Sequence, residues 1–113
     1  MEKENVILQK SFEFALKIIE YSELLEENKK FAIARQLIKS GTSIGANINE
    51  AQSAESKADF IHKLKISDKE AHETNYWLQL CKMSKNYPDP DSLQNELTEI
   101  MKLLSKIISS SKH

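Results

Sequence analysis

Residues 40–49 read SGTSIGANIN, a stretch without a single charge in a chain of which 29% of residues are charged, and it holds both glycines of the protein. Small and apolar residues recur through it at three- and four-residue steps, the spacing of one face of an α-helix. This series consists of Ile33, Leu37, Gly41, Ile44, Ile48 and Ala51. The pattern therefore predicts that residues 40–49 form the middle of a helix.

A flexible loop and a phosphate-binding loop are the alternatives for this stretch. The phosphate-binding loop requires a Gly-Lys-Ser/Thr ending, and residues 40–49 contain no lysine. Two glycines inside a helix cost about 1 kcal/mol each relative to alanine. The four-residue spacing of Gly41 and Gly45 lets another backbone approach closely, and close helix packing would offset that cost.

The same periodicity divides the chain into four helical segments, at about residues 4–26, 29–54, 56–85 and 91–109. Two glycines and two prolines leave room for few turns. Short connections between long helices favour antiparallel neighbours. We therefore expect an all-α, antiparallel, up-and-down four-helix bundle that forms a single domain over residues 1–113.

The ends of these helices carry recognisable signals. Asn28 is expected to end the first helix and to cap the start of the second. Ser56, followed three residues later by Asp59, resembles a capping box at the start of the third. The sequence NYPDPD at 86–91 stops the third helix at its prolines, and Asp91 or Ser92 is expected to cap the fourth.

Composition narrows the class of protein. A single cysteine, Cys81, allows no disulfide within the chain. The first residues lack the uncharged core of a signal peptide, and no apolar run approaches the length needed to span a membrane. These features predict a cytoplasmic protein without a membrane partner.

Several helices carry a second face that a bundle core does not need. On the second helix, this face is small and polar. On the third, Ile66, Glu73, Trp77 and Leu80 share a face, so that the Glu73 carboxylate needs a donor nearby. These surplus faces predict self-association, and a solvated surface is the alternative. The residues expected at helix-packing or oligomer contacts are Gly41, Ser43, Gly45, Asn47, Glu50, Glu73 and Trp77.

The sequence offers little for catalysis or for a bound metal. A di-iron site in a helix bundle requires two Glu-x-x-His pairs, and the nearest match is the single pair of Asp59 and His62. Three scattered histidines and one cysteine do not form a zinc motif. Cys81 continues the apolar stripe of its helix and is expected to be a buried thiol. We therefore predict no enzyme activity, no cofactor, no metal and no small-molecule substrate.

Charge leaves nucleic-acid binding as an alternative function. The net charge is −1, but residues 29–69 carry eight basic residues against four acidic ones. A basic patch could bind RNA or DNA without sequence preference, and a solvated helix face is the competing interpretation. The candidate residues are Arg35, Lys39, Lys57, Lys63, Lys65 and Lys69.

Two stretches, SGTSIGANINEA at 40–51 and DFIHKLKISDKEAHETNYWL at 59–78, resemble the family of four-helix-bundle proteins encoded in intervening sequences of bacterial large-subunit ribosomal RNA genes. The family pattern Ser-x-Ser-Ile-x-x-Asn-Ile-x-Glu-Gly corresponds to the first stretch. Ala51 stands where a glycine is common, and Gly41 where the earlier serine is expected. The matching positions are Ser43, Ile44, Asn47, Ile48 and Glu50.

The second stretch resembles the family at the start of the third helix and in its middle. Phe60 matches the aromatic entry to the helix. Glu70 and Glu73 correspond to a Ser-x-x-Glu element, with Glu70 in place of the serine. The resemblance extends over roughly residues 10–105.

The resemblance implies a homopentamer without enzyme activity and with a poorly defined cellular role. A related branch of the family serves as the accessory protein of diversity-generating retroelements, where a basic barrel contacts nucleic acid and a reverse transcriptase. We therefore expect a homo-oligomeric scaffold whose partner is another protein or a nucleoprotein. The alternative is an oligomer that binds RNA or DNA and acts with a nucleoprotein.

Overall fold

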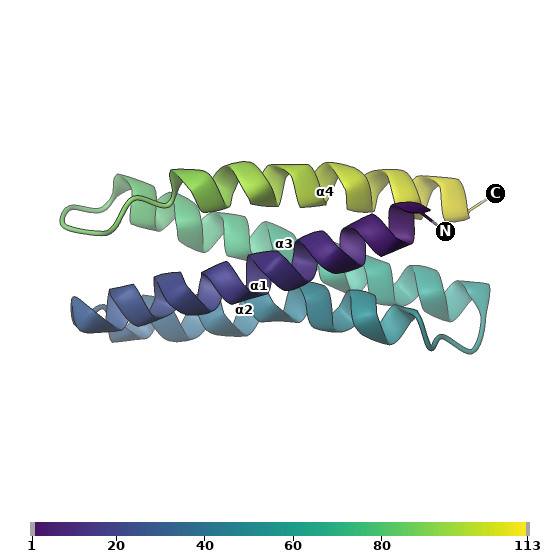
Figure 1. Cartoon of the computed structure of the whole chain (residues 1–113), viewed down its shortest axis with the longest axis horizontal. Helices are drawn as coiled ribbons and strands as arrows, with labels where there is room; N and C mark the ends of the chain where they lie inside the picture. Colours follow the sequence, from purple (N-terminus) through teal and green to yellow (C-terminus); the bar gives the residue numbers. More distant parts are fainter. Residues whose placement is uncertain (1, 113) are drawn as a thin grey trace.

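The computed structural model describes residues 2–112 and consists of four helices in this range (Figure 1). The helices are α1 (Glu2–Glu27), α2 (Phe31–Ala51), α3 (Lys57–Met83) and α4 (Asp91–Ser111). Residues 40–49 lie inside α2, so the prediction of a continuous helix through this stretch is confirmed and the loop alternatives are wrong. In residues 2–112, none of the helices has the length and apolar character required to cross a membrane.

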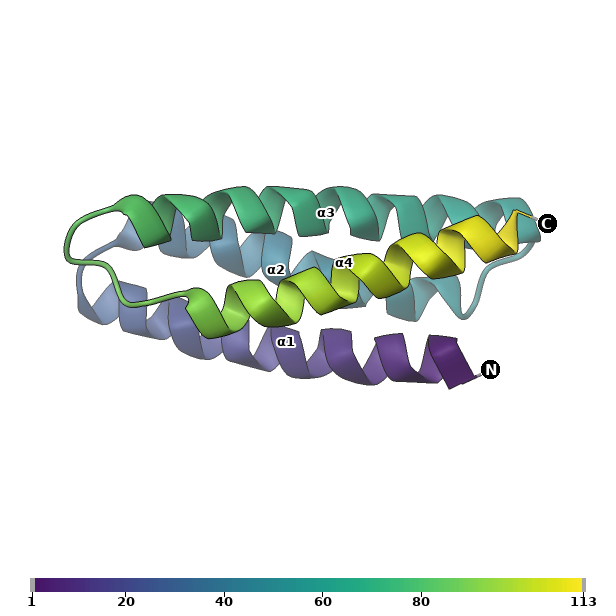
Figure 2. The same cartoon turned by 90° about the horizontal axis from the view of Figure 1, so that it is seen from above.

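The helices form one elongated bundle with principal dimensions of 46 × 20 × 19 Å. Contacts run around the bundle, from α1 to α2, α2 to α3, α3 to α4 and α4 back to α1. Figures 1 and 2 show the α1–α2 and α3–α4 loops at one end of the bundle. The α2–α3 loop lies at the other end, where α1 begins and α4 ends.

The core consists of the apolar stripe of each helix. Their three- and four-residue spacing places these side chains on one side of the helix, where they leave water together. Twelve large side chains are less than 2% exposed, and they come from all four helices. They are Ile7, Phe14, Ile18 and Leu25 of α1, Leu37, Ile44 and Ile48 of α2, Leu64 and Leu78 of α3, and Leu97, Ile100 and Leu104 of α4.

The start of α3 has the cap that the sequence predicts. Ser56 has extended backbone, and its hydroxyl oxygen accepts a hydrogen bond from the Asp59 backbone N–H at 3.0 Å. The Asp59 carboxylate in turn accepts from the backbone N–H of Glu55 at 3.3 Å. The reciprocal bond therefore reaches one residue further back than in a standard capping box.

The prediction that Asn28 caps α2 is wrong. The backbone N–H of Lys30 donates to the Leu25 carbonyl at 2.8 Å, and that of Lys29 donates to the Glu26 carbonyl at 2.9 Å. Lys29 has a φ of 63°. These features are a Schellman motif that ends α1. Asn28 stops α1 as expected, but its amide donates back to the Leu24 carbonyl at 2.8 Å, and α2 begins later without a side-chain cap.

The predicted cap of α4 is also wrong. Asp91 is the first helical residue, and Pro90 occupies the N-cap position without a side-chain hydrogen bond. The Asp91 backbone N–H donates instead to the Asp89 carboxylate at 3.0 Å. The proline fixes the backbone that leads into the helix, so an acid two residues before Asp91 takes the place of a conventional cap.

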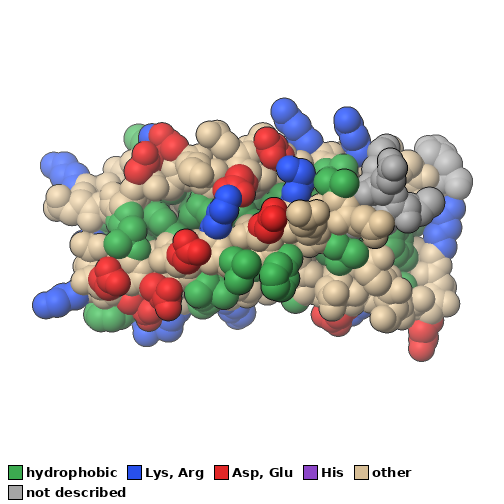
Figure 3. Space-filling view, in the orientation of Figure 1, with side chains coloured by type: hydrophobic (Ala, Val, Ile, Leu, Met, Phe, Trp, Pro, Cys, Tyr) green, Lys and Arg blue, Asp and Glu red, His purple; other side chains and the backbone are tan. Residues whose placement is uncertain are grey.

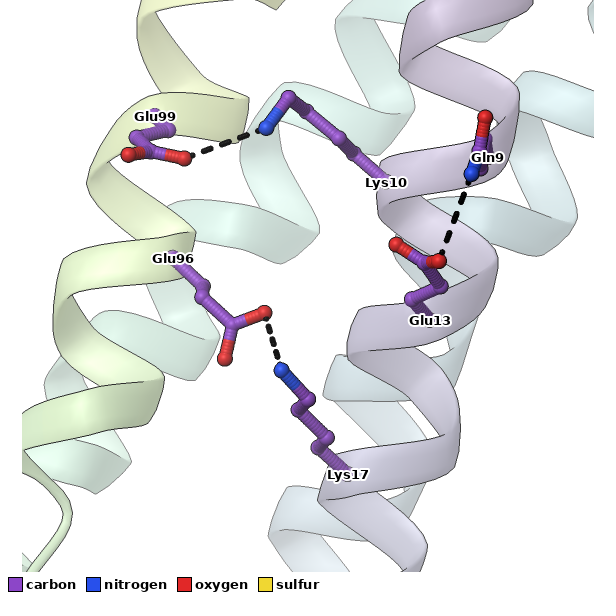
Figure 4. Close-up of polar contacts among 6 residues, drawn as sticks. All are labelled: Gln9, Lys10, Glu13, Lys17, Glu96 and Glu99. Atoms are coloured by element: carbon purple, nitrogen blue, oxygen red, sulfur yellow. Dashed lines mark hydrogen bonds and ion pairs between the residues drawn. The ribbon is translucent and has the colours of Figure 1, made fainter.

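Ion pairs join α4 to both of its neighbours. On the α1 side, Lys10 lies 3.2 Å from Glu99 and Lys17 lies 2.8 Å from Glu96 (Figure 4). The hydrogen bond to Glu96 raises the pKa of Lys17. On the α3 side, Lys82 and Asp91 are 2.6 Å apart.

Candidate interaction surfaces

The two glycines of α2 face α1. A Cβ atom at Gly41 would lie 2.8 Å from both Cγ atoms of Ile18, and one at Gly45 would lie 3.3 Å from the backbone oxygen of Ser11. Helices can approach this closely only where side chains are absent. The glycines therefore serve the α1–α2 contact within one subunit.

The contact between α2 and α3 is lined with small hydroxyl side chains. Ser40 and Thr74 are both fully buried, and their hydroxyl oxygens lie 2.9 Å apart in a hydrogen bond. The Ser67 hydroxyl donates to the Ile44 carbonyl of α2 at 2.8 Å. Because each of these buried groups has a partner, the polar residues cost little at this contact.

The remaining polar residues predicted on α2 bond within the subunit. The Ser43 hydroxyl donates to the Lys39 carbonyl at 2.6 Å, and the Asn47 amide donates to the Ser43 carbonyl at 2.8 Å. Glu50 lies 3.4 Å from Lys63 of α3. Ser43 and Asn47 are partly exposed and Glu50 is exposed, so all three stay accessible to another chain.

The hydrogen-bond donor that the Glu73 carboxylate was expected to need comes from the next turn of its own helix. Trp77 donates from Nε1 to the Glu73 carboxylate at 3.2 Å. The Trp77 ring is partly buried against the core and meets the Tyr76 ring edge-on, with ring centroids 5.3 Å apart. Glu73 itself is exposed.

Beside Trp77, α3 exposes a group of large apolar side chains that we call the α3 patch: Tyr76, Leu80 and Met83. Tyr76 is 55% exposed and Met83 is 83% exposed. Sequence reasoning placed only Leu80 on an outer face and missed the other two. Their spacing of four and three residues is the helical signal that could have identified the patch.

A second apolar surface runs along α1 and α2. An uncharged groove of about 300 Å³ lies between these helices, and we call it the α1–α2 groove. Phe12 lines this groove, and 65% of its surface is exposed. Figure 3 shows hydrophobic side chains among the charged ones on the face where α1 lies in front. The groove is lined by Leu8, Ser11, Phe12 and Ala15 of α1 and by Thr42, Gly45, Ala46 and Asn49 of α2.

The six basic residues predicted to bind nucleic acid do not gather into one patch. Arg35 and Lys39 lie in the first half of α2, and the other four lie in the first half of α3. Figure 2 shows that α2 and α3 begin at opposite ends of the bundle, so the two groups start from opposite ends and extend toward its middle. The four residues on α3 are Lys57, Lys63, Lys65 and Lys69.

The titratable groups that could serve chemistry are dispersed. Among the side chains of residues 5–112, no three His, Cys, Asp or Glu groups lie together in a way that could hold a metal ion. Cys81 is 2% exposed, and burial raises the pKa of its thiol. A thiol with a raised pKa holds little of the nucleophilic thiolate at neutral pH.

The fold and these surfaces define an all-α four-helix protein that leaves large apolar side chains exposed outside its core. The chain belongs to the family of 23S rRNA-intervening sequence proteins, whose model matches residues 3–106. No curated protein matches the chain.

Among solved structures, the chain is similar to a protein of unknown function from the S23 ribosomal protein family of Bacteroides thetaiotaomicron VPI-5482, determined by crystallography at 1.70 Å. The two sequences are 49% identical, and the structures superpose with a TM-score of 0.89. The match covers 95% of this chain and 98% of the other. The similarity thus extends over essentially the whole of both chains.

Proposed function

We propose that this protein is a non-enzymatic, homo-oligomeric scaffold built from antiparallel up-and-down four-helix bundles. Its copies assemble into a homopentamer, as the family resemblance implies. The assembly presents its remaining surface to a protein or nucleoprotein partner. The single cysteine is compatible with the cytoplasm as the compartment in which it acts.

The observation that carries this proposal is the amount of apolar surface left outside the core. Among the side chains of residues 5–112, nine large hydrophobic ones are exposed, and Phe12 and Met83 are the most exposed of them, at 65% and 83%. Large contiguous patches of exposed apolar surface on a soluble protein mark interaction sites. A second copy of the chain would remove from water those that lie at the α1–α2 groove and in the α3 patch, namely Phe12, Tyr76, Leu80 and Met83.

The two surfaces differ in shape and lie on different helices. The α1–α2 groove is concave and includes the small residues Ala15, Gly45 and Ala46. The α3 patch consists of long side chains that project from one helix. Seating the patch of one copy in the groove of the next gives a heterologous contact, and such a contact closes into a ring when its rotation permits. This arrangement favours a ring over a two-fold dimer.

The native mass in solution tests the proposal. Light scattering behind a sizing column should give a multiple of the 13.0 kDa subunit mass. Phe12→Ser should lower that mass, because it removes the most exposed apolar side chain of the groove. Leu24→Ser is the matched control, since Leu24 is 41% exposed on the same helix but lies outside the groove.

The circular dichroism spectrum should stay helical in both variants, because neither side chain belongs to the buried core. A wild-type protein that runs as a single subunit at all concentrations would overturn the proposal. An unchanged mass for Phe12→Ser would exclude the groove as the contact.

A further inference from the structure

A third surface, distinct from both apolar ones, lies between α3 and α4. It is a groove of about 690 Å³ that shares no residue with the α1–α2 groove or the α3 patch. We call it the α3–α4 groove. It is lined by Lys65, Asp68, His72 and Asn75 of α3, by Thr98, Met101, Lys102, Ser105, Ile108 and Ser109 of α4, and by Lys112, which directly follows α4.

The charges of the α3–α4 groove are predominantly positive. Three lysines line it together with a single carboxylate, that of Asp68, which lies 3.6 Å from Nε2 of His72. Lys65, Lys102 and Lys112 make no ion pair with any side chain that the structure describes. The lysines at other helix contacts lie 2.6–3.4 Å from carboxylate oxygens; they are Lys10, Lys17, Lys63 and Lys82.

The uncharged lining of the groove suits a phosphate ligand. Side-chain amide and hydroxyl groups of Asn75, Ser105 and Ser109 can donate hydrogen bonds to phosphate oxygens, whereas the Thr98 hydroxyl already donates to the Gln94 carbonyl at 2.9 Å. Met101 and Ile108 form its apolar part. With no Phe, Tyr or Trp in the lining, the groove offers no platform for stacking bases.

The spacing of the lysines indicates the size of the ligand. Lys102 lies on α4, and Lys112 directly follows the end of this helix, ten positions further along the chain. Ten residues of helix span about 15 Å. One phosphate group cannot contact both ammonium groups at that separation. A chain that carries phosphates at intervals can contact both while also reaching Lys65 across the groove.

We propose that the α3–α4 groove binds a single strand of nucleic acid through its phosphate backbone, without sequence preference. The site differs from the set of six basic residues that the sequence suggested and shares only Lys65 with it. It is independent of the proposed assembly, because the subunit contacts and the groove use different residues. An oligomer would repeat the groove and strengthen binding to a long strand through avidity.

The test is a binding titration that follows the fluorescence anisotropy of labelled oligo-uridine and oligo-thymidine. Both strands should bind at about 50 mM salt, and log affinity should fall with log salt with a slope near −2, as expected for three phosphates neutralised on a single strand. The triple variant Lys65→Gln, Lys102→Gln, Lys112→Gln should bind about tenfold more weakly or worse, since each exposed charge contact contributes a factor of about two to five.

The matched control is the triple variant Arg35→Gln, Lys39→Gln, Lys85→Gln, which makes the same change in net charge at exposed positions outside the groove. It should keep its affinity within about twofold. Ser105→Glu is a second groove variant that leaves the lysines in place and adds a carboxylate. It should also weaken binding.

Three results would overturn the proposal: no binding of either strand at low salt, equal losses in the groove and control variants, or tighter binding of a duplex of the same length. Native mass measured on the same samples separates this proposal from that of assembly. An oligomer that binds no strand refutes only the groove, and a single subunit that binds refutes only the assembly.

Discussion

Replacing Gly41 by alanine tests the close contact between α1 and α2. The new Cβ atom would lie 2.8 Å from Cγ1 and Cγ2 of Ile18 and 3.1 Å from its Cδ1. Both Cγ atoms are bonded directly to Cβ of a fully buried, β-branched side chain. Such a side chain has little freedom to rotate away, so either Ile18 or the helix has to move.

The expected change in stability is the sum of two opposing effects. Alanine in place of glycine favours the helix by about 1 kcal/mol, and overpacking a core costs about 1–3 kcal/mol. Gly41→Ala should therefore destabilise the protein by about 0–2 kcal/mol. Gly45→Ala should be closer to neutral, because its Cβ would lie 3.3 Å from the nearest atoms, both of Ser11.

A double-mutant cycle separates the two effects. Ile18→Ala alone costs about 2–5 kcal/mol because it leaves a cavity, but it also removes all three atoms that obstruct a Cβ at position 41. In the Ile18→Ala background, Gly41→Ala should stabilise the protein by about 1 kcal/mol. The coupling energy should therefore be about 1–3 kcal/mol.

Urea unfolding followed by circular dichroism measures these differences. The protein concentration must be held constant across variants, because assembly makes apparent stability depend on it. Additivity of the two substitutions within about 0.5 kcal/mol would refute the packing argument. A clear stabilisation by Gly41→Ala in the wild-type background would refute it as well.

Three further substitutions probe single contacts. The hydrogen bond from Lys82 lowers the pKa of Asp91, so this pair stabilises the fold above the ordinary carboxyl pKa, and the stabilisation is lost as pH falls through the lowered pKa. Asp91→Asn should reduce the melting temperature at pH 7, and this reduction should shrink as the pH is lowered into the acid range. Ser67→Ala removes the buried 2.8 Å hydrogen bond to the Ile44 carbonyl and should cost about 0.5–1.5 kcal/mol in urea unfolding. Lys29→Gly should raise stability by a few tenths of a kcal/mol up to about 1 kcal/mol, since glycine adopts the φ of 63° at this position without strain; a lower melting temperature would contradict this.

Prediction from the sequence was most successful for features that depend on the residues of one helix alone. The stripe of Ile7, Phe14, Ile18 and Leu25 is buried as its spacing predicts, and the Ser56 cap depends only on residues within one turn. It was right that α1 ends at Asn28 but failed for the cap of α2, because Lys29 adopts a positive φ that propensity does not favour and α2 begins only after Lys30.

The positions of the surfaces could not be predicted in the same way. Helical periodicity identifies the faces of each helix but not which neighbour covers them. The glycines of α2 were expected at a close contact, and only the packed bundle assigns that contact to α1. The six basic residues looked like one group in the sequence, yet they lie on two helices that begin at opposite ends of the bundle.

The sequence by itself determined four amphipathic helices and the continuity of the second one through residues 40–49. These properties follow from side-chain spacing and backbone propensity, which act over a few residues. Only the tertiary structure decided that Lys65, Lys102 and Lys112 line one groove and that Phe12 and Met83 stay exposed. Both outcomes depend on how the helices are arranged around the core, and this arrangement is set by packing between residues far apart in the chain.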